Sequence, residues 1–150
     1  MSDANLPSLA PYLTVIDARA AIAFYQQAFG AVETGPRLTA PDGVIMHAEL
    51  SIGGGSVMLA EHVPDFGTFE PRSLGGTPVR LSLQVDDADA VVAAATAAGA
   101  TVVIPVEDQF YGHRAGRVED PFGHVWIISQ VFEALSAEEM QRRMEALFQG

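Results

Sequence analysis

The chain repeats one order of sequence patterns at an offset of 70 residues. The offset preserves the alternation of the expected strands and the position of an expected helix cap. The matched positions are Leu13 with Leu83, Val15 with Val85, Asp17 with Asp87, Glu49 with Glu119 and Gly53 with Gly123. A single offset that keeps both features indicates a duplicated architecture, in which two similar modules lie side by side.

The first copy predicts a β-α-β-β-β order. Residues 11–16 have the pattern of a short strand that ends at Asp17, a residue suited to cap a helix N-terminus. Apolar residues then recur at helical spacing until Gly30, which favours the end of a helix. The remaining strands of this copy are expected at residues 31–38, 44–52 and 56–61.

The second copy follows a segment rich in proline and glycine. Residues 78–85 predict a strand, and Asp86 or Asp87 is expected to cap an alanine-rich helix that ends at Gly99. Its later strands are expected at residues 101–105, 113–119 and 124–131. The predicted organisation is one domain over 1–132, with module one at 9–62, a linker at 63–77, module two at 78–132 and a C-terminal helical extension at 133–150.

The extension begins with a helix signal. Ser136 and Glu139 have the spacing of a capping box, and Met140, Met144 and Leu147 line one helix face. This apolar face must pack either on its own domain or on a second subunit. The small size of the chain favours the second alternative.

Composition excludes several classes of chemistry. The 150-residue chain contains no cysteine, which excludes disulfides, zinc-thiolate sites and a thiol nucleophile. All eight basic residues are arginine, so a Schiff-base lysine and a phosphate-loop lysine are also absent. A formal charge of −11 argues against nucleic acid and anionic membranes as partners and favours a cationic ligand. No signal-peptide pattern or membrane span is visible, so a cytoplasmic setting is expected.

Three motifs carry a resemblance to a known family. They are the opening Tyr12-Leu13-Thr14-Val15-Ile16-Asp17 with Ala21-Ile22-Ala23-Phe24-Tyr25, the closing Asp120-Pro121-Phe122-Gly123-His124, and Gln109-Phe110-Tyr111-Gly112-His113-Arg114. With the paired modules, they resemble the vicinal oxygen chelate superfamily of glyoxalase I, extradiol dioxygenases and bleomycin resistance proteins. The last motif resembles the PhnB-like branch. The resemblance implies an α+β fold whose modules form a concave mixed sheet, or cup, usually in homodimers.

The resemblance also implies where a divalent metal would be bound. The metalloenzymes of the superfamily take one ligand from the first and one from the last strand of each module. Carried over to this chain, these positions fall on Ala10, Val57, Arg80 and Ile127. Hydrocarbon side chains donate no lone pair and arginine carries a fixed positive charge, so we predict no metal cofactor.

Strand alternation predicts which side chains face the cup. Met46, Trp126 and Val118 are expected on the helix side, and Val57, Leu59 and Ile127 are expected to form an apolar lining of the cup. The candidate catalytic residues are Glu49 and His47. The candidate ligand-binding residues are Tyr12, Thr14, Arg80, Ser82, Gln84, Tyr111, His113, Arg117 and Glu119.

Each candidate also has a purely structural interpretation. Glu49 with Arg80 or Arg117 would equally form an ion pair that only neutralises buried charge, and a histidine on a strand is more often structural than basic. Phe66 and Phe69 of the linker form either a lid over the pocket or a cover for a sheet edge.

Two functions remain open at this point. The first is a metal-free protein of the bleomycin resistance type, which binds and sequesters an antibiotic or metabolite in a homodimer. The second is a lyase, isomerase or dioxygenase-like enzyme acting on a small polar metabolite. Glu49 would then be the general base, with His47 relaying protons and Arg80 or Arg117 stabilising an oxyanion.

Overall fold

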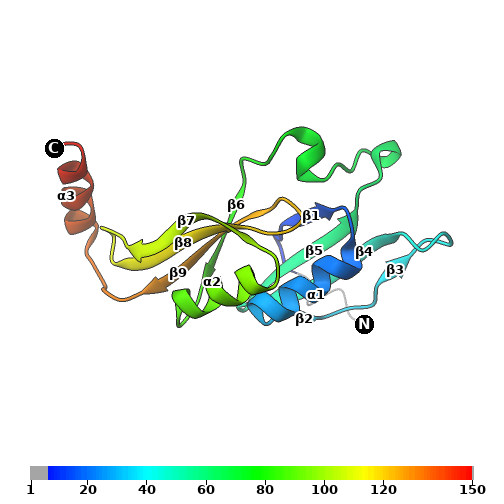
Figure 1. Ribbon diagram of the computed structural model, residues 1–150, viewed down its shortest axis with the longest axis horizontal. Coiled ribbons are helices and arrows are strands. Elements are labelled where there is room, and N and C mark those ends of the chain that lie inside the picture. The colour runs from blue at the N-terminus through cyan, green and yellow to red at the C-terminus, as the bar shows by residue number, and fades with distance from the viewer. Residues whose placement is uncertain (1–6, 150) are drawn as a thin grey trace.

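The computed structural model describes residues 7–149 as two separate sheets that share one layer of helices (Figure 1). The first sheet has the order β1-β5-β4-β2, with β3 also paired to β4, and the second has the order β6-β9-β8-β7. The first module contains β1 (Tyr12–Val15), α1 (Ala18–Phe29), β2 (Val32–Glu33), β3 (Leu38–Thr39), β4 (Ile45–Ile52) and β5 (Gly55–Glu61). The second contains β6 (Arg80–Gln84), α2 (Ala88–Ala97), β7 (Thr101–Asp108), β8 (His113–Glu119) and β9 (Val125–Val131).

The two crossover helices start as the sequence predicts. Asp17 and Asp87 are their N-caps, and each carboxylate accepts a hydrogen bond from the backbone amide three residues later at 3.0 Å. Gly30 ends α1 in the left-handed conformation. The two helices lie side by side in this layer and pack against each other, so the core is continuous from one module to the other (Figure 1).

The strand expected at residues 31–38 is wrong, because it is interrupted. β2 ends at Glu33 and β3 begins only at Leu38. Gly35 and Pro36 occupy the break, and proline lacks the amide hydrogen that a ladder requires. β7 is longer than the strand expected at residues 101–105. It continues through Pro105 to Asp108 as an edge strand with two register shifts.

The hairpin between β8 and β9 joins the two modules. Asp120 is 1% exposed and accepts hydrogen bonds from the backbone amides of Phe122 and His124 at 2.9 and 3.0 Å. The same carboxylate also accepts from the Tyr25 hydroxyl of α1 at 2.5 Å and from the Trp126 indole at 2.9 Å. The Asp-Pro-Phe-Gly turn therefore does more than reverse the chain, since it ties the second sheet to the helix of the first module.

The linker at 63–77 contains two short 3₁₀ helices, η2 (Pro64–Phe66) and η3 (Pro71–Leu74). Arg72 of η3 donates to the carbonyl of Pro121 at 2.6 Å, so the linker also contacts the junction hairpin. Glu70 is buried and caps η3 by accepting from the Ser73 amide.

The C-terminal helix α3 (Ala137–Leu147) lies at one end of the elongated molecule, away from the layer of helices (Figure 1). Ser136 caps it as predicted, accepting from the Glu139 amide at 3.1 Å. None of its residues is buried, and Arg143 makes contact with the body by donating to the Phe110 carbonyl at 3.0 Å. No helix within residues 7–149 combines the length and apolar composition needed to cross a bilayer.

Candidate functional site

A chain of three side chains crosses the open face of the first sheet. The Tyr12 hydroxyl lies 2.6 Å from Nδ1 of His47, and Nε2 of His47 lies 3.0 Å from a carboxylate oxygen of Glu49. A carboxylate only accepts, so Nε2 donates to Glu49; with a neutral imidazole, Nδ1 then accepts from Tyr12. The sequence predicted all three residues on this face, and the structure brings them into direct contact.

Sheet register assembles this chain. Tyr12 of β1 and Glu49 of β4 both pair with Met58 of β5, which lies between them. Partial burial, followed by the negative charge of Glu49, raises the pKa of the Tyr12 hydroxyl. The phenol therefore stays protonated, as a hydrogen-bond donor to His47 requires.

Two adjoining pockets of about 310 and 350 Å³ extend from this face toward the linker. Tyr12 and Thr14 line the first, and Met46 and Phe66 line both. Phe66 is therefore a wall of these pockets. From the sequence it remained open whether Phe66 forms a lid over the pocket or covers a sheet edge.

Met46 was expected on the helix side, and this prediction is wrong. Ile45 and Ala48 are both buried, whereas the two residues between them are only partly covered. The pairing of β3 with β4 shifts register here, since Leu38 pairs with His47 and Thr39 with Ile45. The bulge adds one residue to β4 and turns Met46 toward the pockets.

The predicted lining by Val57 and Leu59 is also wrong. Both side chains are buried on the helix side, at 6% and 0% exposure, and Met58 and Ala60 lie on the open face instead. The cause is the length of the second hairpin. β4 and β5 are joined by two residues, whereas five residues separate β8 from β9. The offset between modules therefore falls from 70 to 67 on the last strand, where Met58 matches Val125.

The same registers revise the positions implied for metal ligands. Arg80 pairs with Val125 as Tyr12 pairs with Met58, so Tyr12 matches Arg80, and Ala10 precedes β1. Ile127 matches Ala60, since these residues pair with Ser82 and Thr14. A donor set of one phenol, one guanidinium and two hydrocarbon side chains does not fit a divalent metal. Within residues 7–149, no three metal-binding side chains gather elsewhere.

The open face of the second sheet carries arginines where the first carries Tyr12 and His47. Arg80 lies on β6, Arg117 on β8, and β9 runs between them. Ser82 and Arg117 both pair with Ile127, so these three form one row across the sheet. Arg117 lines a pocket of about 120 Å³ with Ile104, Ile127, Gln109 and Tyr111 among its other walls.

Charged partners on this face differ from the predicted ones. Glu119 pairs with Arg72 of the linker at 3.2 Å, and Glu49 hydrogen-bonds to His47. No ion pair within residues 7–149 joins Glu49 to Arg80 or Arg117, because the modules present these residues on separate sheets. Arg72 was not predicted, since nothing in the linker sequence indicates that η3 folds against the hairpin.

The loop between β7 and β8 supplies aromatic and amide groups to the second face. The rings of Tyr111 and His113 lie 5.1 Å apart, and Nδ1 of His113 lies 2.7 Å from the Ser129 hydroxyl. Gln109 donates to the carbonyl of Ala115, which holds it at the pocket, although it was not among the predicted site residues. Its place in the Gln109-to-Arg114 motif was the available signal.

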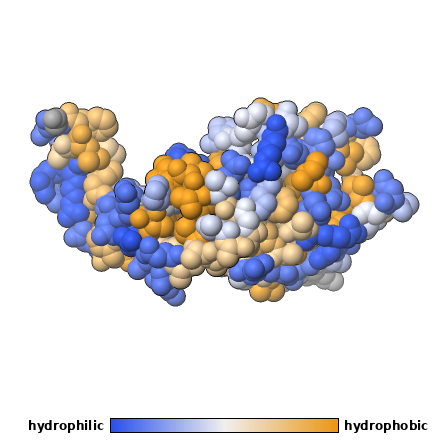
Figure 2. Space-filling model, viewed as in Figure 1, coloured by the Kyte–Doolittle hydropathy of each residue, from blue (hydrophilic) through white to orange (hydrophobic). Residues whose placement is uncertain are grey.

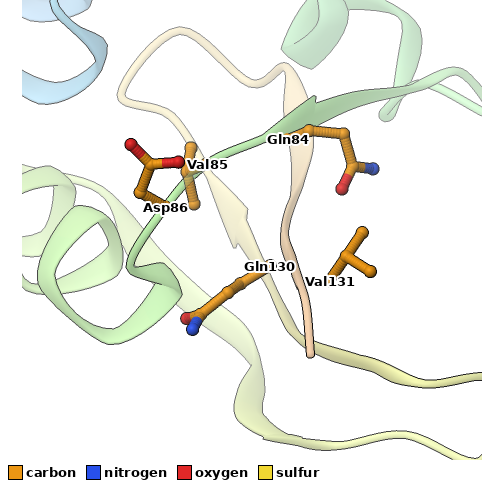
Figure 3. A pocket seen from close by; sticks show the side chains of 5 residues that line it. All are labelled: Gln84, Val85, Asp86, Gln130 and Val131. Atoms are coloured by element: carbon orange, nitrogen blue, oxygen red, sulfur yellow. The ribbon is translucent and has the colours of Figure 1, made fainter. Parts of the chain in front are cut away.

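Gln84 lies at the end of this face. It lines a depression of about 340 Å³ with Val85, Asp86, Gln130 and Val131 (Figure 3). The side chains of Gln84 and Val131 lie on one side of the strands, and those of Asp86 and Gln130 lie on the other (Figure 3). Gln130 has a structural role, because its side-chain oxygen accepts a hydrogen bond from the backbone amide of Ala88, the first residue of α2, at 2.9 Å.

Comparison with known proteins places this fold. Residues 6–128 match the family described as the Glyoxalase/Bleomycin resistance protein/Dioxygenase superfamily. The chain belongs to this family. An uncharacterised protein of Mycobacterium tuberculosis strain H37Rv is 47% identical over 147 residues, which are 96% of this chain and 86% of the relative.

Solved structures agree with this assignment. The Arabidopsis thaliana gene product At5g48480 is 31% identical with a TM-score of 0.66, covering 83% of this chain and 98% of that one. TioX from Micromonospora sp. ML1 is 29% identical with a TM-score of 0.61, covering 87% and 100%. The vicinal oxygen chelate assignment and the α+β fold with a C-terminal helix are thus confirmed.

Proposed function

We propose that this protein binds a small molecule without a resident metal, in a cup of the glyoxalase and bleomycin resistance type. The observation that carries the proposal is the lining of the two open sheet faces. Hydrogen-bonding groups lie beside apolar walls there, as in most small-molecule sites, while the residues at the four metal positions do not together fit a divalent metal.

The proposal includes a homodimer. Members of this superfamily often dimerise. In this chain the two sheets are not hydrogen-bonded to each other, and each presents its own polar face. A second copy would bring the Tyr12 face of one subunit against the Arg80 face of the other. We also assign the chain to the PhnB-like branch, supported by the Gln109-to-Arg114 motif. A PhnB protein of Bacillus cereus shares the fold at 18% identity.

The test is a ligand screen on metal-stripped protein. Metabolites and cationic glycopeptide antibiotics would be screened by ligand-observed NMR, and hits would be titrated by calorimetry. We expect binding that added metal leaves unchanged and that Tyr12→Phe weakens, because the phenol lies on the pocket wall. Thr96→Val, which removes a hydroxyl on α2, is the matched control. Stoichiometric transition metal in untagged protein would contradict the proposal.

A second candidate function rests on the Tyr12–His47–Glu49 chain. A carboxylate that orients an imidazole, which in turn contacts a phenol, is an arrangement used for proton transfer. Such an enzyme would use Glu49 as base and His47 as relay, with Arg80 or Arg117 from the second face stabilising an oxyanion. If a ligand from the screen is turned over, Glu49→Gln should abolish turnover but not binding. Intact turnover in that variant would reject this role.

A further inference from the structure

The second sheet face contains two arginines that have no ion pair or hydrogen bond with another residue of the described part, 7–149. All eight arginines lie within residues 7–149. Six of them contact a carboxylate or a backbone carbonyl, whereas Arg80 and Arg117 contact neither among residues 7–149. This is unexpected in a chain with 19 acidic residues, in which most guanidinium groups have found a partner.

Sheet register directs both arginines to the same side. Arg80 is opposite Val125 and Arg117 is opposite Ile127, and these two β9 residues are two positions apart, on one face. The arginines lie on the two sides of β9, two strand spacings or about 10 Å apart across the sheet and two residues or about 7 Å apart along it, so roughly 12 Å separates their Cα atoms. Flexible arginine side chains from both sides can therefore reach one group held over the apolar surface of Val125 and Ile127.

The carboxylates on this face do not neutralise the positive charge of Arg80 and Arg117. Glu119 is already paired with Arg72, and Glu107 lies on the edge strand opposite Ala115. Arg117 is half-buried at a pocket whose other walls include Ile104, Ile127 and Tyr111. The Tyr111 hydroxyl makes no hydrogen bond within the described part of the chain, which leaves one more donor beside the guanidinium.

The geometry points to an oxyanion subsite: Arg80 and Arg117 bind a carboxylate, phosphate or phosphonate group of a small ligand whose apolar body lies on Ile104 and Ile127. Guanidinium groups recognise such oxyanions through paired hydrogen bonds. This inference rests on the proposed function and names its ligand class. The total charge of −11 favours a cation, but local charges within a Debye length decide what a pocket accepts.

The experiment uses four probes that share a phenyl ring: phenylphosphonate, benzoate, benzyl alcohol and benzylamine. Their affinities for the full chain would be measured by calorimetry at low salt. We expect the two anions to bind more tightly than the alcohol and the amine, and added salt to weaken them. The order of phenylphosphonate and benzoate distinguishes a phosphorus oxyanion from a carboxylate.

Arg80→Gln and Arg117→Gln should each weaken anion binding about tenfold to hundredfold, since each removes a hydrogen bond to a charged group. Arg142→Gln on α3 makes the same charge change outside the cup and should leave the anion affinity unaltered. Thermal melts verify folding, and Arg117→Lys, which retains charge but loses the planar fork, should bind with intermediate affinity.

Several results would overturn the subsite. These are benzylamine binding as tightly as benzoate, anion affinity unchanged in both glutamine variants, or no binding of either anion. Suppose that a neutral or cationic ligand binds and that Tyr12→Phe, but neither arginine variant, abolishes this binding. That result would overturn the oxyanion subsite and leave the proposed function standing. A screen without any ligand would instead count against the proposed function.

Discussion

Among single residues, Asp120 links the two modules through one carboxylate. Its buried carboxylate accepts from two side chains on different elements and from two amides of its own turn. Burial, and then the charge of Asp120, raises the pKa of Tyr25 well above its ordinary value, so the phenol remains a donor. The sequence predicted the turn and the position of Trp126 on the helix side of the sheet, but not the contact between Tyr25 and Asp120 across 95 residues.

Asp120→Asn should destabilise the protein by about 2 to 4 kcal/mol, because an amide cannot satisfy all four donors. Urea denaturation would measure the free energy of unfolding. Asp65→Asn makes the same change at an exposed position of η2 and serves as control. Equal stability of the two variants would show that the carboxylate is dispensable.

Tyr12 offers a pH readout of the hydrogen-bonded chain. Burial, and then the negative charge of Glu49, raises the pKa of its hydroxyl. Glu49→Gln should therefore lower this pKa toward its ordinary value, while burial keeps it raised. A ¹³C-tyrosine NMR titration would follow it, with the more distant Tyr111 as an internal control. An unchanged Tyr12 titration would place Glu49 away from the phenol.

At the scale of elements, local chemistry made some features predictable and left others hidden. Helix caps and β8 followed from residues adjacent in sequence. The bulge at Met46 and the longer second hairpin did not, because alternation defines two faces without saying where one residue is inserted. Three mistaken cup positions, at Met46, Val57 and Leu59, follow from these two insertions.

The loop before β8 depends on Gly112. Its φ is 84°, and a Cβ there would lie 2.3 Å from the Glu133 carbonyl oxygen. Gly43 has a similar φ of 91° but open space around it. Gly43→Ala should cost about 1 to 2 kcal/mol from backbone strain alone. Gly112→Ala should lower stability clearly more in thermal denaturation, because its Cβ would also clash with Glu133. Equal losses of stability in the two variants would mean that the loop shifts away from Glu133 without cost.

At the scale of the whole molecule, the duplicated modules have diverged in charge. Register matches Tyr12 with Arg80 and His47 with Arg117, while Glu49 matches Glu119. One sheet thus presents a hydrogen-bonded chain of three side chains and the other presents two arginines. Apolar side chains also remain exposed on β7 and α3, at Val102, Val103, Ile104, Met144 and Leu147 (Figure 2). The proposed dimer would join unlike sheet faces from two subunits.

That arrangement predicts complementation between two variants that each bind ligand weakly. His47→Gln should damage the first sheet face and Arg117→Gln the second, so each homodimer alone should bind ligand weakly. If each cup takes one face from each subunit, a mixed dimer carries one intact cup and one doubly altered cup. Mixing the variants through mild unfolding and refolding should restore part of the wild-type binding capacity. Light scattering would establish the dimer mass, and a capacity that stays at the level of the separate variants would place each cup within a single chain.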